Sequence, residues 1–383
     1  MRRQGLFREL RRVDSAQGTR IKVGSRTLLN FSSNDYLGLA NHPALKEASI
    51  KAVEKFGAGA GASRLICGSL APFHELEEKL ADFKKTEAAL TFSTGYATAL
   101  GTICALLGKD DIIIIDKLVH ASIVDAARLS GAKLRVFAHN DVNELEDILK
   151  WTANHKSQIA NRKSQTLIVT ESIFSMDGDA APLREIVELK NKYGAWLMVD
   201  EAHATGLYGK NRRGLAEELC VSNQIEIQMG TLGKALGASG GYICGSRKLI
   251  DFLVNRARSF IFSTAPVPAA AAAATAAIRF IQSSKGEARR MKLCLRIWEM
   301  QSQIANRKSQ ISCAIIPLIV GDESRAVELA AKLREQNIFI PAIRYPTVAR
   351  GAARLRITLT AAHSSNDIAT LTSALSQIKN LKS

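Results

Sequence analysis

The chain has 383 residues, of which 46% are hydrophobic and 23% charged, values ordinary for a soluble globular enzyme. This length favours one large domain with a smaller one, and no apolar run approaches a membrane span. The 52 basic and 36 acidic residues give a net charge of +16. The basic residues are spread along the chain without an aromatic-interleaved block, so we expect no nucleic-acid partner. Six scattered cysteines, with no C-x-x-C pair, favour neither a zinc site nor a disulfide framework and fit a reducing cytoplasm.

The first twelve residues, "MRRQGLFRELRR", are basic but lack the apolar segment of a secretory signal. They predict a short amphipathic helix, with a transit peptide as the alternative. Helical and strand patterns then alternate through the middle of the chain. Continuous apolar runs predict strands at 111–116, 166–172, 195–203, 225–234 and 240–246. Such runs, separated by helices, are typical of a buried and mostly parallel sheet in an α/β fold. An alanine-rich helix at 268–281 leads into a C-terminal part of mixed helix and strand.

One nine-residue segment, "SQIANRKSQ", occurs twice, at 157–165 and at 302–310. Each copy follows a helical pattern and precedes a strand pattern, a place where surface loops tolerate insertion. We interpret both copies as inserted surface segments without a function of their own.

Chemically capable side chains follow four of the predicted strands. His120 follows the first, Ser175 the second, Asp200 and His203 the third, and Thr231 and Lys234 the fourth. In parallel sheets ligands bind beyond the carboxyl ends of the strands, so these residues are expected to converge. Lys234 lies in "GTLGKALGASGGY", which lacks both the upstream glycine and the following Ser or Thr of a phosphate-binding P-loop.

The set suits pyridoxal phosphate (PLP). A lysine can form a Schiff base with the aldehyde, and a carboxylate, here Asp200, can keep the pyridine nitrogen protonated. His203 could hydrogen-bond the ring oxygen, and His120 could stack on the ring. The phosphate needs N–H groups at a helix start, which "TFSTGYATALGTICALL" offers at Thr94, Gly95 and Tyr96, with Thr231 as a second donor.

Five motifs resemble the α-oxoamine synthases, a branch of the fold-type I, aspartate aminotransferase-like PLP enzymes. They are "NFSSNDYLGL" (30–39), "DKLVHASIVDAARLSGA" (116–132), "SMDGDAAPL" (175–183), "VDEAHATGLYG" (199–209) and "TLGKALGASGG" (231–241). The resemblance implies that Lys234 carries PLP, that Asp200 and His203 contact its ring, and that His120 stacks on it. It also implies that Ser175 lies near the ring hydroxyl and that Asn34 contacts the acyl substrate. The family forms homodimers with shared active sites, in which Thr264 would reach the neighbouring subunit's phosphate.

Two further stretches, "FAHNDV" (137–142) and "AIRYPTVARGAARLRITLTAAH" (342–363), resemble the members that join L-alanine to a pimeloyl thioester on the pathway to biotin. The alternative is a member that joins glycine to acetyl-CoA. An arginine fork can grip a carboxylate with two hydrogen bonds, so Arg356, with Arg354 or Arg344 nearby, is expected to hold the amino-acid carboxylate. The acyl group could be carried by CoA or by an acidic acyl carrier protein.

These expectations define three segments: an N-terminal arm at 1–40, a large PLP-binding domain at 41–270 and a smaller α+β domain at 271–383. The expected reaction is a decarboxylative condensation in which Lys234 removes the α-proton. We expect a cytoplasmic enzyme without a metal ion.

Overall fold

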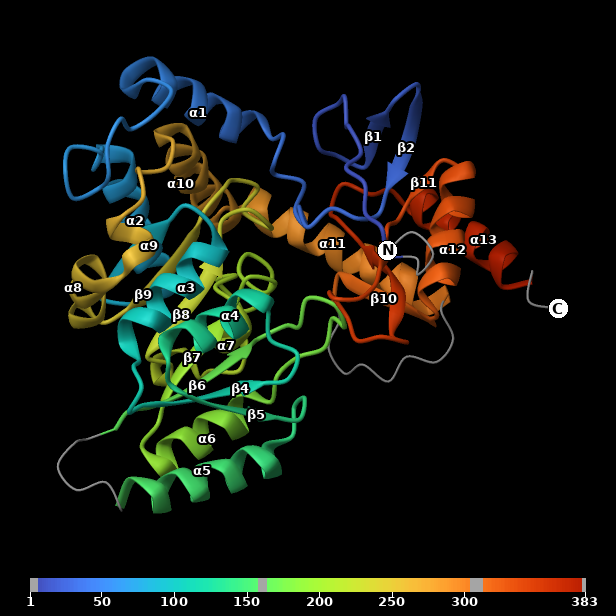
Figure 1. Cartoon of the computed structure of the whole chain (residues 1–383). Coiled ribbons are helices and arrows are strands. Elements are labelled where there is room, and N and C mark those ends of the chain that lie inside the picture. Colours follow the sequence, from blue (N-terminus) through green and yellow to red (C-terminus); the bar gives the residue numbers. More distant parts are fainter. Residues whose placement is uncertain (1–5, 158–163, 304–312, 381–383) are drawn as a thin grey trace. The chain divides into compact units, whose positions relative to one another are not determined.

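The computed structural model describes residues 6–157, 164–303 and 313–380 (Figure 1). The chain divides into two compact units. Unit 1 comprises residues 1–42, 175–179 and 284–383, and unit 2 comprises 43–174 and 180–283. The expected boundaries lay near 40 and 270. In this division the N-terminal residues belong to the same unit as the C-terminal elements. No helix within the described part of the chain is long and apolar enough to cross a membrane.

Unit 2 is built on a seven-stranded sheet with the order β3-β9-β8-β7-β6-β4-β5. The strands are β3 (Ala88–Phe92), β4 (Ile112–Asp116), β5 (Lys133–Phe137), β6 (Thr166–Glu171), β7 (Trp196–Asp200), β8 (Ile227–Thr231) and β9 (Gly241–Gly245). β9 runs antiparallel to both neighbours, and the other pairs are parallel. The prediction of a mostly parallel buried sheet is therefore confirmed.

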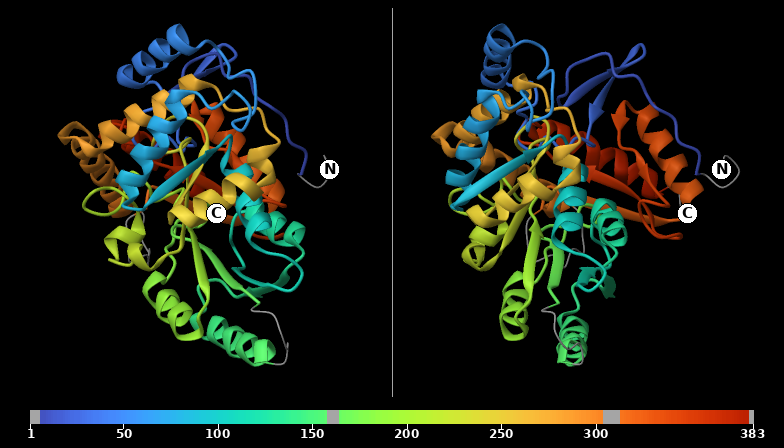
Figure 2. Two further views of the ribbon diagram at one scale, coloured as in Figure 1. Left: turned by 90° about the vertical axis from the view of Figure 1, so that its left-hand side faces the viewer. Right: turned by 60° about the vertical axis from the view of Figure 1, so that its left-hand side comes forward.

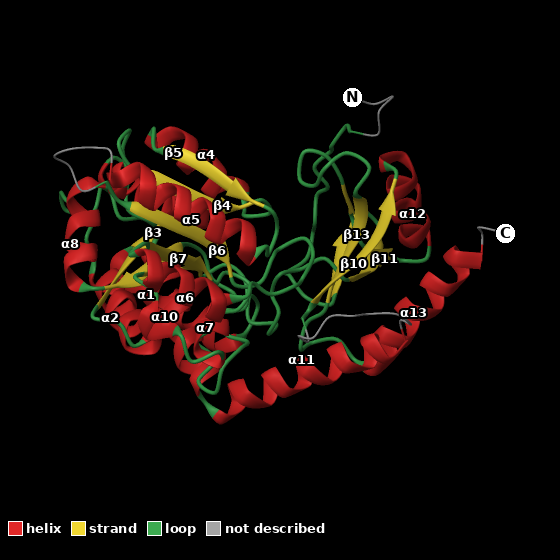
Figure 3. Ribbon diagram, turned by 90° about the horizontal axis from the view of Figure 1, so that it is seen from below, coloured by secondary structure: helices red, strands yellow, loops and turns green. Residues whose placement is uncertain are grey.

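Helices cover both faces of this sheet (Figures 1 and 3). The helices of unit 2 are α1 (Pro43–Phe56), α2 (Ala71–Lys84), α3 (Gly95–Leu106), α4 (Ala121–Ser130), α5 (Val142–Ser157), α6 (Leu183–Tyr193), α7 (Leu215–Glu218), a 3-10 turn (Ser222–Gln224), α8 (Arg247–Arg256), α9 (Arg258–Ile261) and α10 (Pro268–Gln282). The local sequence explains where several of these helices begin or end. The Thr94 side chain caps α3, and left-handed Gly131 and Gly194 end α4 and α6.

Unit 1 contains two small sheets. The first joins β1 (Arg20–Val23) and β2 (Arg26–Asn30) to β11 (Ile338–Phe339), and the second orders β10 (Ile315–Gly321), β13 (Ala353–Thr358) and β12 (Ala342–Ile343). Its helices are α11 (Ser284–Gln303), α12 (Glu323–Glu335) and α13 (Ser365–Asn380). Because β2 pairs with β11, the N-terminal hairpin lies beside the C-terminal elements, as Figure 2 shows.

The predicted N-terminal helix is wrong over the described residues, since 6–14 contain no helix. The hydrogen bonds of these residues to the C-terminal part of unit 1 explain the absence of a helix. The Phe7 carbonyl accepts a hydrogen bond from Arg344, and the Arg8 side chain donates to Thr347 at 3.1 Å. These tertiary contacts outweigh a local helical preference. Most of each "SQIANRKSQ" copy lies outside the described residues, but the flanking elements, α5 with β6 and α11 with β10, agree with the predicted helix-to-strand connections.

Candidate active site

The carboxyl ends of the parallel strands of unit 2 bring Lys234, His203 and Asp200 to one edge of the sheet. The amine of Lys234 lies 2.9 Å from Nε2 of His203. Asp200 is the last residue of β7 and is 6% exposed, with one carboxylate oxygen accepting the N–H of Ala202 at 2.9 Å. A buried carboxylate, an amine and an imidazole therefore meet where a ligand of an α/β sheet binds.

His120 belongs to the same cluster. It precedes α4, and its Nδ1 accepts the N–H of Ser122 at 3.2 Å, which fixes the ring orientation. Burial lowers the pKa of His120, Asp200 opposes this effect, and the positive charge of Lys234 adds to it. Both charged groups are thus close enough to act on the ring. A neutral, oriented imidazole suits stacking on an aromatic cofactor.

A candidate phosphate cradle lies at the start of α3. Thr94 Oγ1 accepts the N–H of Ala97 at 3.0 Å, which leaves the first N–H groups, those of Gly95 and Tyr96, without an intrahelical acceptor. A Cβ added at Gly95 would lie 3.9 Å from Cβ of Thr231, so the end of β8 borders this helix start. Such N–H groups, with the helix dipole, favour an anion. The Thr231 hydroxyl donates to the Gly240 carbonyl at 3.0 Å and must turn before it can donate to a phosphate.

Glycine is required at the start of β9 for this cradle to form. A Cβ at Gly241 would lie 2.3 Å from Thr98 Oγ1 and 2.9 Å from the Cα of Gly95. The strand therefore passes directly behind the first turn of α3. The small residues around Lys234 provide this close approach. Together, an amine, a carboxylate, an imidazole pair and a helix start with open N–H groups fit the chemical parts of PLP.

Thr264 lies in a different setting from the other expected PLP contacts. It forms an isolated antiparallel bridge with Ser63, and the N–H of Ala265 donates to the Ala62 carbonyl at 3.0 Å. The loop containing Ser63 is anchored by Arg64, whose fork binds both oxygens of Glu77 at 2.9 Å. Thr264 itself is exposed. The expectation that it reaches a partner subunit stays a prediction.

A buried ion pair supports the turn that carries His203. Lys84 and Glu201 are each 1% exposed at the side chain, and Nζ of Lys84 donates to Glu201 and, at 2.6 Å, to the Arg213 carbonyl. The other oxygen of Glu201 accepts the N–H of Ala216 at 2.9 Å. Sequence reasoning missed this pair, because its members are 117 positions apart and no local pattern links them.

In unit 1 the structure brings together Arg356, Asn34 and Ser175. Arg356 is 6% exposed, and its Nε donates to the Ser175 carbonyl at 2.6 Å. Its Nη1 donates to Asn34 Oδ1 at 3.0 Å and to Thr358 Oγ1 at 2.9 Å. Nη2 of Arg356 has no hydrogen-bond partner among the described residues. The guanidinium is therefore held in place by neutral acceptors, with one edge open for an anion.

The other two arginines have different surroundings. Arg354 and Arg356 are two positions apart in the buried strand β13. Unlike Arg356, Arg354 forms an ion pair with Asp177 and donates to the Met176 carbonyl at 3.2 Å. Arg344 follows β12 and donates to the Phe7 carbonyl. It lines a separate pocket with the N-terminal segment. Of the three, Arg356 offers the open edge that a substrate carboxylate needs.

Comparison with known proteins places these observations in a family. Residues 26–375 match the model of the class I and II aminotransferases. A curated relative from Geobacter sulfurreducens, named 8-amino-7-oxononanoate synthase, is 45% identical over 99% of this chain and 95% of its own length. A relative of the same name from Anaeromyxobacter dehalogenans is 46% identical over 98% of this chain and 92% of its own length.

Solved structures of similar proteins support the same family. A serine palmitoyltransferase from S. paucimobilis, with bound PLP and myriocin, matches with a TM-score of 0.87 and 28% identity, covering 95% of this chain and 91% of its own. The 8-amino-7-oxononanoate synthase of Francisella tularensis matches with a TM-score of 0.76 and 28% identity, over 93% and 99%. The chain thus belongs to the class I and II aminotransferase family, and within it to the PLP-dependent group whose members are named 8-amino-7-oxononanoate synthase.

Proposed function

We propose that this chain catalyses the decarboxylative condensation of L-alanine with a pimeloyl thioester, which yields 8-amino-7-oxononanoate, CO2 and a free thiol on the pathway to biotin. The observation that carries the proposal is the Lys234–His203 contact beside Asp200, in a chain 45% identical to a curated relative of that name. The relatives reported above do not favour the glycine and acetyl-CoA alternative.

PLP, when bound, supplies an aldehyde that condenses with an amine and a pyridinium ring that accepts an electron pair. Lys234 would hold the cofactor through its amine, and the N–H groups of Gly95 and Tyr96 would hold the phosphate. Asp200 would keep the pyridine nitrogen protonated, because a buried carboxylate favours the charged form of a cationic partner. His120 would cover one face of the ring.

The substrate steps fall to a few side chains. Arg356, through its open Nη2 edge, holds the carboxylate of L-alanine, and Asn34 lies beside it. Lys234 is the group that would take the proton from the alanine Cα. The new carbon–carbon bond forms between that Cα and the thioester carbonyl, and the thiol leaves with a proton. His203, 2.9 Å from the lysine amine, donates or accepts the proton that moves during loss of CO2 and reprotonation of Cα.

The proposal also covers the oligomeric state of the protein and the carrier of the acyl group. The protein works as a cytoplasmic homodimer in which Thr264 contacts the phosphate bound in the neighbouring subunit. An acidic acyl carrier protein is proposed as a donor besides pimeloyl-CoA, since the net charge of +16 favours encounter with an acidic partner. A rate with the carrier-linked donor that is unchanged at high salt would contradict this electrostatic contribution.

The test is thiol release by the PLP-loaded protein in four pairings, L-alanine or glycine against pimeloyl-CoA or acetyl-CoA. Release with L-alanine and pimeloyl-CoA alone is expected. Release with glycine and acetyl-CoA would overturn the substrate assignment. A Lys234→Ala variant should bind PLP without a Schiff base, recognised by its absorbance and its resistance to borohydride, and should lose turnover. Near-normal turnover in that variant would refute the mechanism.

A further inference from the structure

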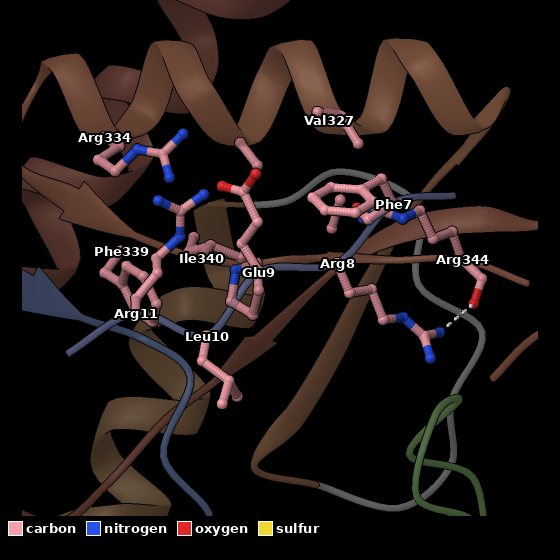
Figure 4. Close-up of a pocket in the computed structure, with 13 residues that line it drawn as sticks. Phe7, Arg8, Glu9, Leu10, Arg11, Val327, Arg334, Phe339, Ile340 and Arg344 are labelled. Atoms are coloured by element: carbon pink, nitrogen blue, oxygen red, sulfur yellow. Dashed lines mark hydrogen bonds between the residues drawn. The ribbon is translucent and has the colours of Figure 1, made fainter. Parts of the chain in front are cut away.

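Unit 1 contains a pocket that the proposed reaction does not use. It has a volume of about 680 Å³ and lies between the N-terminal segment 7–11, helix α12 and residues 339–344 (Figure 4). The N-terminal segment, which is neither helix nor strand over these residues, forms one wall. Volumes of roughly 300–1,000 Å³ are typical of small-molecule sites.

Two arginines lie at one end of the pocket. Arg11, from the N-terminal segment, and Arg334, from the last turn of α12, form no ion pair or hydrogen bond with any described residue. Figure 4 shows their guanidinium groups close to each other beneath a helix. The pKa of Arg334 is lowered by burial and then by the positive charges of Arg11 and Arg26, while the negative charge of Glu335 opposes this effect. Positive charge therefore prevails at this end, an arrangement that favours a bound anion.

A second pair of arginines lines the same pocket. Nη2 of Arg8 donates to Thr347 Oγ1 at 3.1 Å and lies 3.4 Å from the Arg344 carbonyl. Burial and the charge of Arg8 lower the pKa of Arg344, whose Nε is buried without a hydrogen-bond partner. Both cations thus have only neutral acceptors. Glu9, the one carboxylate among the described lining residues, neutralises at most one of the four charges.

The walls between the arginines are apolar and partly aromatic. They are formed by Phe7, Val327, Ala330, Phe339, Ile340 and Pro341. An aliphatic and aromatic lining with a few placed charges is the usual composition of a site for an organic ligand. A bare inorganic anion would leave these walls in contact with water.

We propose that this pocket binds a phosphorylated nucleotide, with its phosphates on the arginines and its base against the apolar wall. Two groups of cations require a ligand with more than one anionic group, and planar guanidinium forks bind phosphate oxygens in pairs. A planar base also stacks on aromatic rings and on guanidinium groups. The nucleotide belongs either to a CoA thioester or to a free adenine nucleotide.

Direct binding tests the proposal without reference to turnover. Holoenzyme is titrated by calorimetry with adenosine 3′,5′-bisphosphate, ADP and inorganic phosphate. We expect saturable binding of the nucleotides, weaker binding of phosphate, and affinity at least tenfold lower in an Arg11→Gln/Arg334→Gln variant. Arg325→Gln is the matched control, because Arg325 lies on the same helix outside the pocket and pairs with Glu328 at 2.7 Å. Absence of nucleotide binding to the wild type, or equal affinity in the double variant, would overturn the proposal.

Steady-state rates then identify the source of the nucleotide. If it is part of the donor, the double variant raises KM for a CoA thioester and leaves KM for the matching pantetheine thioester unchanged. If it is a free nucleotide, the variant loses binding in the titration while both KM values stay the same. An enzyme inactive with every donor would contradict the proposed function, whereas the titration would still decide on the pocket.

Discussion

Replacing Lys84 by methionine tests how the turn that carries His203 is held. The Lys84 side chain is 1% exposed, and Glu201 is equally buried. Glu201 raises the pKa of Lys84 against the opposing effect of burial, so the amine is charged in the folded protein. Methionine fills similar volume but removes the charge and both hydrogen bonds of Nζ. The carboxylate of Glu201 then stays buried, and among the described residues the Ala216 N–H is its one remaining donor.

The expected loss of stability is large. Removing one partner of a buried pair destabilises by about 3–5 kcal/mol, because the remaining charge is uncompensated. Unit 2 falls in the size range where each kcal/mol shifts Tm by about 2–4 °C, so a decrease of about 6–20 °C is expected. In the double variant Lys84→Met/Glu201→Gln the charge is gone, and most of the stability should return.

The assay is thermal and urea unfolding of the full chain, followed by circular dichroism, for wild type, both single variants and the double variant. The four free energies form a cycle whose interaction energy isolates the pair. Lys192→Met is the control, since Lys192 is 61% exposed at the side chain and pairs with Glu146 at the surface, where little change is expected. A Lys84→Met variant as stable as this control, or a double variant less stable than either single one, would refute the reasoning.

Three further outcomes are expected. Gly241→Ala should weaken PLP binding more than it lowers stability, because its Cβ would meet Thr98 Oγ1 at 2.3 Å and displace the phosphate cradle; unchanged cofactor affinity in a fluorescence titration would contradict this. Arg356→Lys should raise KM for L-alanine at least tenfold and leave KM for the thioester nearly unchanged, which steady-state kinetics will show. Burial lowers the pKa of His363, whose Nε2 lies 3.0 Å from the Asn30 carbonyl. The unfolded chain therefore takes up a proton first, and stability should fall as pH drops from about 6.5 towards the folded pKa; denaturation at pH 7.5, 6.5 and 5.5 should show a smaller fall in His363→Gln.

The strands that could be predicted are those buried on both faces. The run of isoleucines in β4 and the apolar runs in β6 and β7 indicate such strands without any tertiary information. β5, "KLRVF", was missed because it is an edge strand with exposed positions. Its mixture of charged and apolar residues resembles that of a loop. β3 was missed because its short run merges with the helical pattern of α3.

The convergence of Lys234 and Asp200 could be predicted because parallel strands end at one edge, so each residue's place followed from its own strand. Arg344 and Arg354 could not be told from Arg356 in the same way. Only the fold shows that Asp177 pairs with Arg354, from 177 positions away. The N-terminal segment was mispredicted for the same reason. Its local pattern suits a helix, but its hydrogen-bond partners are the residues around Arg344, far away in the sequence.

The pairing of β2 with β11 has a consequence for synthesis. Leu29 and its partner Ile338 are separated by most of the chain, so at roughly 5–20 residues per second the hairpin leaves the ribosome tens of seconds to a minute before its partner strand exists. A lone hairpin is marginally stable in water, and this one must wait unpaired while unit 2 emerges and folds. A circular permutant that begins at residue 284 would make the two strands near neighbours in time, and its nascent chain should spend less of its synthesis with an open strand edge.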